Sequence, residues 1–179
     1  MKKTKESRRV KMTKNLLKAS LAELLESDPI AKVTIKKICE NADVNRSTFY
    51  TYYHDQFDLL DEIENEVIST VPSINLHIKQ PREKLLTEFF EYMNDNKKIY
   101  IALFKNSANQ KFRSRAINKL FGKSDSDTDW ILKTDITDGI HFPMLMSAFG
   151  AVSLAEKWIF GEINCTAREL AFAIAKFIE

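Results

Sequence analysis

The chain has 179 residues, enough for one large helical domain or a core with a smaller appended domain, and 44% of them are hydrophobic. Because it contains only 4 Gly and 4 Pro and shows no sustained two-residue apolar alternation, we expect an all-α fold. The basic first residues lack a following apolar signal segment, and the apolar stretch 142–155 is too short for a membrane span, so we expect a cytoplasmic protein without membrane contact.

Charge is distributed unevenly along the chain. Residues 1–54 carry 12 basic and 6 acidic side chains, a net charge of +6. Residues 55–179 carry 15 basic and 19 acidic side chains, a net charge of −4. This asymmetry indicates that the N-terminal part meets a polyanion, although a basic tail that only aids solubility would produce it too.

The N-terminal helices can be placed from apolar spacing and capping residues. After a frayed segment 1–10, a 3.6-residue apolar period predicts a helix of about 16 residues, which Asp28-Pro29 ends. Thr34 is placed to cap a second helix, and residues 41–44 form the turn that follows it. The side chains expected to face the core across the second and third helices are Ile35, Ile38, Val44, Phe49 and Tyr53.

Asn45 is placed to cap a third helix over residues 46–53, and Asp55 a fourth that runs to Thr70. Longer amphipathic helices are expected beyond them, one opened by Pro81 at its first-turn position, and others over about 98–105, 110–121 and 130–161. A capping box at residues 166–169 begins the last helix. The loop 122–129 is rich in Asp but lacks the downstream Gly and Glu of a calcium loop, so no metal is expected there.

The short helix 46–53 has the features of a helix that reads the major groove. Its N-terminal end carries Asn45, Arg46, Ser47 and Thr48, where free backbone amides and the helix dipole also favour phosphate. Arg reads guanine and Asn reads adenine through paired hydrogen bonds, while Tyr hydroxyls reach phosphate oxygens. The alternative is a small structural bundle, but such a bundle gives no reason for Tyr50 and Tyr52 to cluster on an exposed surface.

These residues also resemble a known family. The pattern Thr-Ile-x-x-Ile-Cys-x-x-Ala-x-Val-Asn-Arg-Ser-Thr-Phe-Tyr-x-Tyr-Tyr-x-Asp-x-x-x-Leu-Leu over residues 34–60 is similar to the DNA-binding domain of TetR/AcrR-type transcriptional regulators. The resemblance implies a homodimer that binds a palindrome in double-stranded DNA. It also implies a helix-turn-helix domain over residues 1–70 and a helical domain over 71–179 for dimerisation and small-molecule binding.

Carried over by position, the resemblance implies a set of DNA-contacting residues. They are Thr34, Asn45, Arg46, Ser47, Thr48, Tyr50, Thr51, Tyr52 and Gln56. Two positions depart from the family pattern. Asp43 replaces a turn glycine, and we expect the turn to survive because Asp tolerates left-handed backbone. Gln56 replaces a phosphate-binding lysine, so one ionic contact fewer per subunit is expected.

The C-terminal half matches more weakly, through a Gly-x7-Trp-x2-Gly signature at Gly150, Trp158 and Gly161 that resembles a subgroup of these regulators. The residues assigned to a dimer interface are Phe149, Gly150, Trp158 and Phe172. The aromatic residues assigned to a ligand pocket, which can equally be plain core, are Tyr92, Tyr100, Phe104, Phe112, Trp130 and Phe142.

The sequence thus predicts a DNA-binding regulator, expected to be a repressor, with a small-molecule effector. The rival hypotheses are a helical co-activator or adaptor that docks its helix-turn-helix face on a protein, and a helical carrier of a lipid or small molecule. No Ser/His/Asp or Cys/His grouping can be recognised, and the three histidines form no local metal pair, so we expect neither an enzyme nor a cofactor.

Overall fold

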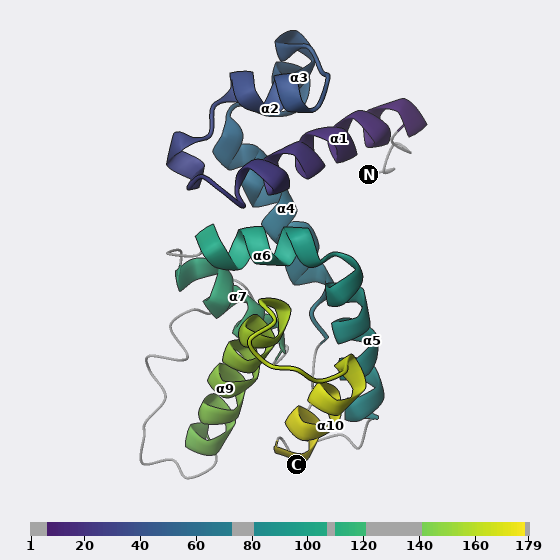
Figure 1. Ribbon diagram of the computed structural model, residues 1–179, viewed down its shortest axis with the longest axis vertical. Coiled ribbons are helices and arrows are strands. Elements are labelled where there is room, and N and C mark those ends of the chain that lie inside the picture. Colours follow the sequence, from purple (N-terminus) through teal and green to yellow (C-terminus); the bar gives the residue numbers. More distant parts are fainter. Residues whose placement is uncertain (1–6, 73–80, 107–109, 121–140, 178–179) are drawn as a thin grey trace, which may run out of the picture. The chain divides into compact units, whose positions relative to one another are not determined.

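The computed structural model describes residues 7–72, 81–106, 110–120 and 141–177, without the side chains of residues 110–111 and 141–145. Within these ranges every regular element is a helix, which confirms the all-α prediction (Figure 1). The elements are α1 (Arg8–Leu24), the 3-10 turn η1 (Ile30–Lys32), α2 (Ile35–Asn41), α3 (Arg46–Tyr52), α4 (Gln56–Thr70), α5 (Arg82–Asp95), α6 (Lys97–Asn106), α7 (Gln110–Leu120), α9 (His141–Ile159) and α10 (Ala167–Phe177).

The chain divides into two compact units, residues 1–65 and residues 66–179. The first unit contains α1, α2, α3 and most of α4, and the second contains the end of α4 and the later helices. Among the described helices, none is both long enough and apolar enough to cross a membrane.

The beginning of α1 differs from the expectation. Residues 8–10 are helical instead of frayed, because the Ser7 hydroxyl accepts a hydrogen bond from the Val10 amide at 3.3 Å and caps the first turn. The turn η1 follows Pro29 and was not expected from the sequence. Thr34 caps α2 as expected, since its Oγ1 accepts from the Lys37 amide at 3.3 Å.

The turn between α2 and α3 keeps its shape without glycine. Asp43 has φ 52°, in the left-handed region, and the Val44 amide donates to the Cys39 carbonyl at 3.0 Å. This bond closes the C-terminal turn of α2 in the manner usually seen with glycine at the left-handed position. The expectation that Asp43 preserves the turn is confirmed.

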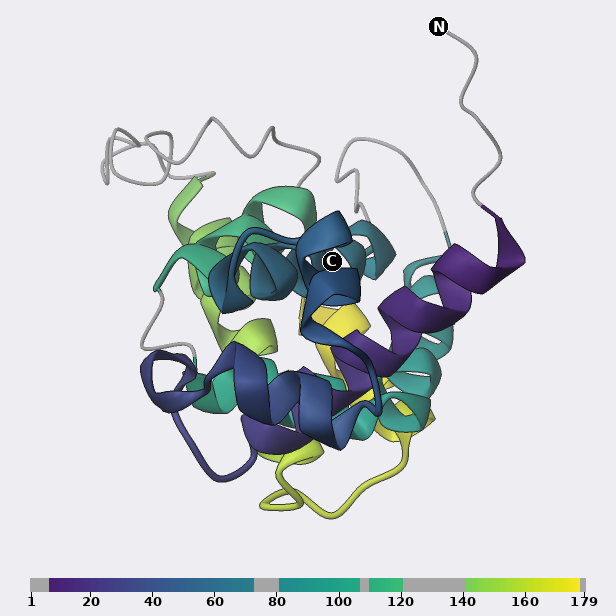
Figure 2. The same cartoon turned by 90° about the horizontal axis from the view of Figure 1, so that it is seen from above.

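The core of the first unit joins all its helices. Leu17 and Leu21 of α1, Ile38 of α2, Phe49 of α3 and Leu59 of α4 have no exposed surface. α1 and α2 are also joined by a buried hydrogen bond of 2.9 Å from the Ser20 hydroxyl to the Ile38 carbonyl. Ile35 and Val44, expected in this core, are only half-buried. Figure 2 shows the same helices from above, with α1 in purple and α2 and α3 in blue.

In the second unit α5 and α10 lie side by side, and α9 packs against α6, α7 and α10. Pro81 lies at the cap position before α5, one residue earlier than expected. The predicted capping box of α10 is confirmed, because the Thr166 amide donates to the Glu169 carboxylate at 2.8 Å and the Glu169 amide donates to the Thr166 hydroxyl at 3.2 Å. Gly161, with φ 79°, ends α9 in left-handed backbone.

The expected helices over 98–105 and 110–121 are present as α6 and α7. The helix expected over 130–161 is described from residue 141, as α9. The expected loop 122–129 and the first part of that helix lie outside the described residues.

Candidate DNA-binding surface and apolar cavity

The outer face of α3 carries most of the residues that the sequence assigned to DNA. The exposed members are Asn45, Arg46, Ser47, Tyr50 and Thr51. Thr48 and Tyr52 are half-buried. The structure therefore brings the set together on one short helix, with its small polar residues and Arg46 at the N-terminal end.

Two aromatic side chains fix the orientation of this face. Phe49 is fully buried and Tyr53 is 3% exposed, with their ring centroids 5.6 Å apart. Tyr50 meets the edge of Phe49 at 5.8 Å, yet 59% of it remains exposed. Because Phe49 is locked in the core, the helix cannot rotate without losing that packing, and the polar face stays turned outward.

The side chains at the start of α3 keep their hydrogen-bonding groups available. Asn45 occupies the cap position as expected, but its side chain makes no cap hydrogen bond. Arg46 makes no ion pair with any residue in the described ranges. The Thr51 hydroxyl, in contrast, donates back to the Ser47 carbonyl at 3.0 Å. Asn45 and Arg46 therefore keep more of their hydrogen-bonding groups available than Thr51 does.

Thr34 caps the start of α2, and Gln56 begins α4 just after the turn that follows α3. Thr34 is exposed, while Gln56 is half-buried. Asp55 accepts hydrogen bonds of 2.9 Å from the Phe57 and Asp58 amides and so caps α4. Gln56 is therefore held at the first turn of a well-capped helix, where its amide can donate without adding charge.

An ion-pair cluster that sequence reasoning missed joins α1 to α4. The Glu62 carboxylate meets Lys18 Nζ at 2.7 Å and Lys14 Nζ at 3.1 Å, and Lys14 also lies over the Tyr53 ring, 5.6 Å from its centroid. Burial by itself raises the pKa of Glu62, but hydrogen bonds and charges of Lys18 and Lys14 outweigh it and hold that pKa below its ordinary value. In the sequence, Lys18 lies next to the apolar positions of α1, which indicates that it is partly buried. The sequence does not indicate which acidic residue pairs with it.

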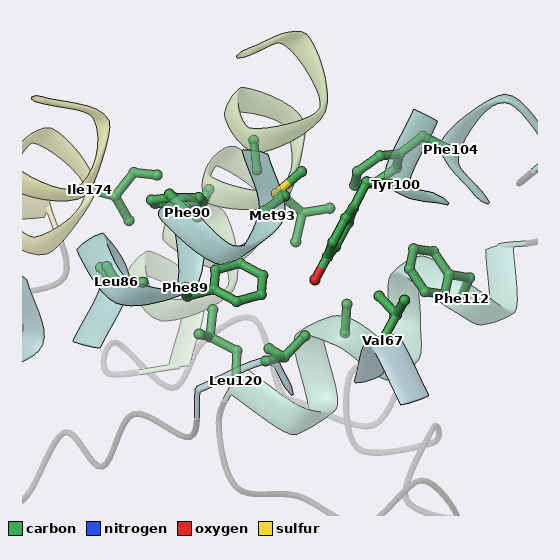
Figure 3. Close-up of a pocket in the computed structure, with 15 residues that line it drawn as sticks. Val67, Leu86, Phe89, Phe90, Met93, Tyr100, Phe104, Phe112, Leu120 and Ile174 are labelled. Atoms are coloured by element: carbon green, nitrogen blue, oxygen red, sulfur yellow. The ribbon is translucent and has the colours of Figure 1, made fainter. Parts of the chain in front are cut away.

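The second unit contains an apolar cavity of about 60 Å³ (Figure 3). It is walled by the end of α4 and by side chains from α5, α6, α7, α9 and α10. The residues that line it are Val67, Val71, Leu86, Phe89, Phe90, Met93, Tyr100, Phe104, Phe112, Ala116, Leu120, Ala151, Val152, Ala155 and Ile174. Every one of them except Tyr100 has a side chain without nitrogen or oxygen.

The cavity gathers part of the aromatic set that the sequence assigned to a pocket. Tyr100, Phe104 and Phe112 line it, and the rings of Phe104 and Phe112 meet edge to face at 5.9 Å. Tyr92 is 47% exposed and is not among the lining residues. Trp130 and the side chain of Phe142 lie outside the described residues.

Tyr100 supplies the polar atom of this lining. The residue is 2% exposed, and its hydroxyl lies 3.0 Å from Thr70 Oγ1. Burial raises the pKa of Tyr100 to about 12. The hydroxyl therefore keeps its proton throughout the physiological range.

Helices α9 and α10 expose large apolar side chains. The exposed residues are Met146, Phe149, Leu154, Phe172 and Phe177. Gly150 lies on the exposed side of α9, and a Cβ atom there would meet no atom of the described residues within 4 Å. Trp158 differs from the other residues assigned to an interface, because it is 9% exposed and its Nε1 donates to the Cys165 carbonyl at 2.8 Å.

No protein-family model and no curated protein matches the chain. Among solved structures, a TetR transcriptional regulator from Streptococcus agalactiae 2603V is similar, with a TM-score of 0.64, 18% identity and 96% of each chain covered. The fatty acid degradation regulator FadR from Bacillus halodurans gives a TM-score of 0.62 at 13% identity, over 98% of this chain and 96% of that one. The dihydroxyacetone kinase operon activator DhaS gives 0.58 at 17% identity, over 93% of each chain.

These similarities extend over nearly the whole chain, so they include the helices of both units. They agree with the resemblance that residues 34–60 show in sequence. The chain has the all-helical fold of TetR-type transcriptional regulators.

Proposed function

We propose that this protein is a DNA-binding transcriptional regulator that inserts α3 into the major groove. The observation that carries the proposal is the outer face of α3, where Asn45, Arg46 and Tyr50 are exposed on a helix locked by Phe49. A buried aromatic anchor beneath an exposed polar face gives α3 the fixed orientation that base reading requires. The net charge of +6 over residues 1–54 favours the approach to phosphate.

Contacts divide into two kinds in this proposal. Arg46 and Asn45 read base edges, because paired hydrogen bonds from Arg or Asn distinguish base pairs in the major groove. Tyr50, Tyr52, Thr34 and Gln56 bind phosphate oxygens and set the register on the duplex. Ser47, Thr48 and Thr51 complete the surface, with Thr51 contributing its methyl group because its hydroxyl is bonded within the helix.

A homodimer would carry two reading helices to the two halves of a palindrome. Large apolar side chains exposed on α9 and α10 support this arrangement, since exposed apolar patches on soluble proteins mark interaction surfaces. Phe149, Gly150 and Phe172 belong to the proposed interface. Trp158 does not, because its side chain is buried within its own unit.

We further propose that the apolar cavity is the effector site and that the output is repression. A small molecule in the cavity would alter α4, whose end forms part of the wall and whose beginning follows α3. One structural neighbour is an operon activator, so activation is the alternative output.

Selection of bound duplexes from a random DNA pool tests the function. We expect an enriched palindrome with half-sites about one helical turn apart or somewhat more. A pool without enrichment would contradict DNA reading and favour the adaptor, in which the same α3 face docks on a protein.

The dimer is tested by Gly150→Leu, followed by analytical ultracentrifugation. A Cβ atom at this exposed position meets no described atom within 4 Å, and replacing glycine within a helix stabilises it by about 0.5–1 kcal/mol. We therefore expect a stable protein with weakened self-association. Lys84→Leu, on an exposed position of α5, is the control and should leave association unchanged. Unchanged association in Gly150→Leu would place the interface elsewhere.

A further inference from the structure

The cavity of the second unit carries chemical information about its ligand. Among its fifteen described lining residues, none has a charged side chain, and Tyr100 alone brings a hydroxyl. A carboxylate, phosphate or ammonium group entering such a site would lose its hydration without gaining a counter-charge. The lining therefore selects against ions and accepts apolar surface.

The direction of the Tyr100 hydrogen bond follows from the neighbouring contact of Thr70. The Thr70 hydroxyl lies 2.7 Å from the Val67 carbonyl oxygen, which can only accept. Thr70 therefore donates its single hydroxyl hydrogen to Val67. The 3.0 Å contact between the two hydroxyls is consequently donated by Tyr100 to Thr70 Oγ1. Figure 3 shows the Tyr100 ring reaching among the cavity side chains with its hydroxyl oxygen at the inner end. A ligand that carries an acceptor must compete with Thr70 for this proton.

We infer that the cavity takes an uncharged, largely apolar small molecule whose single hydrogen-bond acceptor replaces Thr70 as the partner of the Tyr100 hydroxyl. The inference deepens the proposed function and relies on it for the ligand's role as effector. The class includes ketones, esters and ethers with a compact hydrocarbon or aromatic body. It excludes organic acids, phosphate esters and amines that are charged at neutral pH.

The size of the cavity links binding to α4. A cavity of roughly 150 Å³ lined by apolar side chains binds benzene, whereas this one encloses about 60 Å³. A ring-sized ligand must therefore push the walls apart, and Val67 and Val71 at the end of α4 belong to those walls. Thr70 lies between them and gives up its hydrogen bond from Tyr100 in the same event. The ligand thus affects the last turn of α4 in two ways. It displaces the walls formed by Val67 and Val71, and it removes the hydrogen bond that Thr70 accepts from Tyr100.

Three probes of equal heavy-atom number and similar shape test the ligand class by isothermal titration calorimetry on the full chain. Acetophenone carries one acceptor on an apolar body, isopropylbenzene carries none, and benzoate carries a charge. We expect acetophenone and isopropylbenzene to bind and benzoate to bind at least about tenfold more weakly than acetophenone. Binding of benzoate as tight as that of acetophenone, or failure of both neutral probes, would overturn the inference.

Two variants test the acceptor's position. Tyr100→Phe should lower acetophenone affinity about 3–10-fold, the range of one hydrogen bond, and leave isopropylbenzene affinity unchanged. Thr70→Val frees the Tyr100 proton from its competitor, so it should raise acetophenone affinity about 2–5-fold, again without affecting isopropylbenzene. Isopropylbenzene binding verifies that the lining is intact in each variant. Equal changes in affinity for both probes would refute the proposal that the ligand replaces Thr70 as the hydrogen-bond partner of Tyr100. A loss of acetophenone affinity in Thr70→Val would refute it too.

These titrations contain no DNA, which keeps the two proposals separable. If the protein binds an operator but the acceptor preference is absent, the ligand inference fails and the proposed function stands. If the acceptor preference is present and no DNA is bound, the regulator function fails and the cavity chemistry stands. Release of operator DNA by acetophenone, reduced in Tyr100→Phe, would connect them.

Discussion

The two units use aromatic side chains in opposite ways. In the first, Phe49 fills the core completely and thereby holds polar groups of α3 outward in water. In the second, Phe104 and Phe112 surround a cavity that they do not fill, and the single hydroxyl of Tyr100 points inward. A filled core suits the proposed DNA-binding surface, which must keep one orientation. An incompletely filled core suits the proposed effector site, which must change shape when a ligand enters.

The largest expected effect contrasts Phe49 with its neighbour Tyr50. Phe49→Ala removes a fully buried ring and should lower the free energy of unfolding by about 3–5 kcal/mol, measured by chemical denaturation of the full chain. Tyr50→Ala, at a largely exposed position, should change stability by less than about 0.5 kcal/mol yet weaken binding to all DNA sequences. Similar stability losses in both variants would show that α3 is not anchored as described.

Arg46→Ala tests whether α3 contains both base-reading and phosphate-binding residues. We expect a loss of about 1–3 kcal/mol of binding free energy on the selected operator and a relaxed preference at one base pair. Tyr50→Ala serves as the matched control, because removing the hydroxyl proposed to bind phosphate should weaken binding to all DNA sequences equally. If Arg46→Ala also weakens all sequences equally, Arg46 has no base-reading role.

The ion-pair cluster of the first unit should make stability depend on acid. The pKa of Glu62 is depressed in the folded protein, so its stabilising contribution is complete above the unfolded value of 4.5 and is lost as pH falls through the lower folded pKa. Glu62→Gln should lower the free energy of unfolding by about 1–2 kcal/mol at neutral pH. Below the folded pKa of Glu62 the substitution should change it little. Glu88→Gln, at an exposed pair with Lys84, is the control. If the difference in unfolding free energy between Glu62→Gln and the wild type is the same at every pH, Glu62 is not the source of the acid dependence.

The smallest expected effect comes from Gln56→Lys. A lysine at the start of α4 would add one phosphate contact per subunit. The slope of log K against log salt should steepen by about 0.9 for each contact, with stability essentially unchanged. An unaltered slope would mean that this position lies away from the phosphate backbone.

The sequence predicted local features better than distant contacts. The Asp43 turn, the Thr166–Glu169 capping box and the burial of Phe49 follow from short-range chemistry, and the structure has them. The Lys18–Glu62 pair joins residues 44 positions apart, and no local pattern connects them. Tyr92 was assigned to the pocket by composition, but it follows Phe90 by two residues and therefore points to the opposite side of α5.

Salt titration of DNA binding by the full chain tests the central claim most directly. If α3 and the basic N-terminal part bind the duplex as proposed, the logarithm of affinity should fall linearly with the logarithm of salt concentration, with a slope near −0.9 per phosphate neutralised. An affinity that does not change with salt would contradict the DNA-binding surface described for α3.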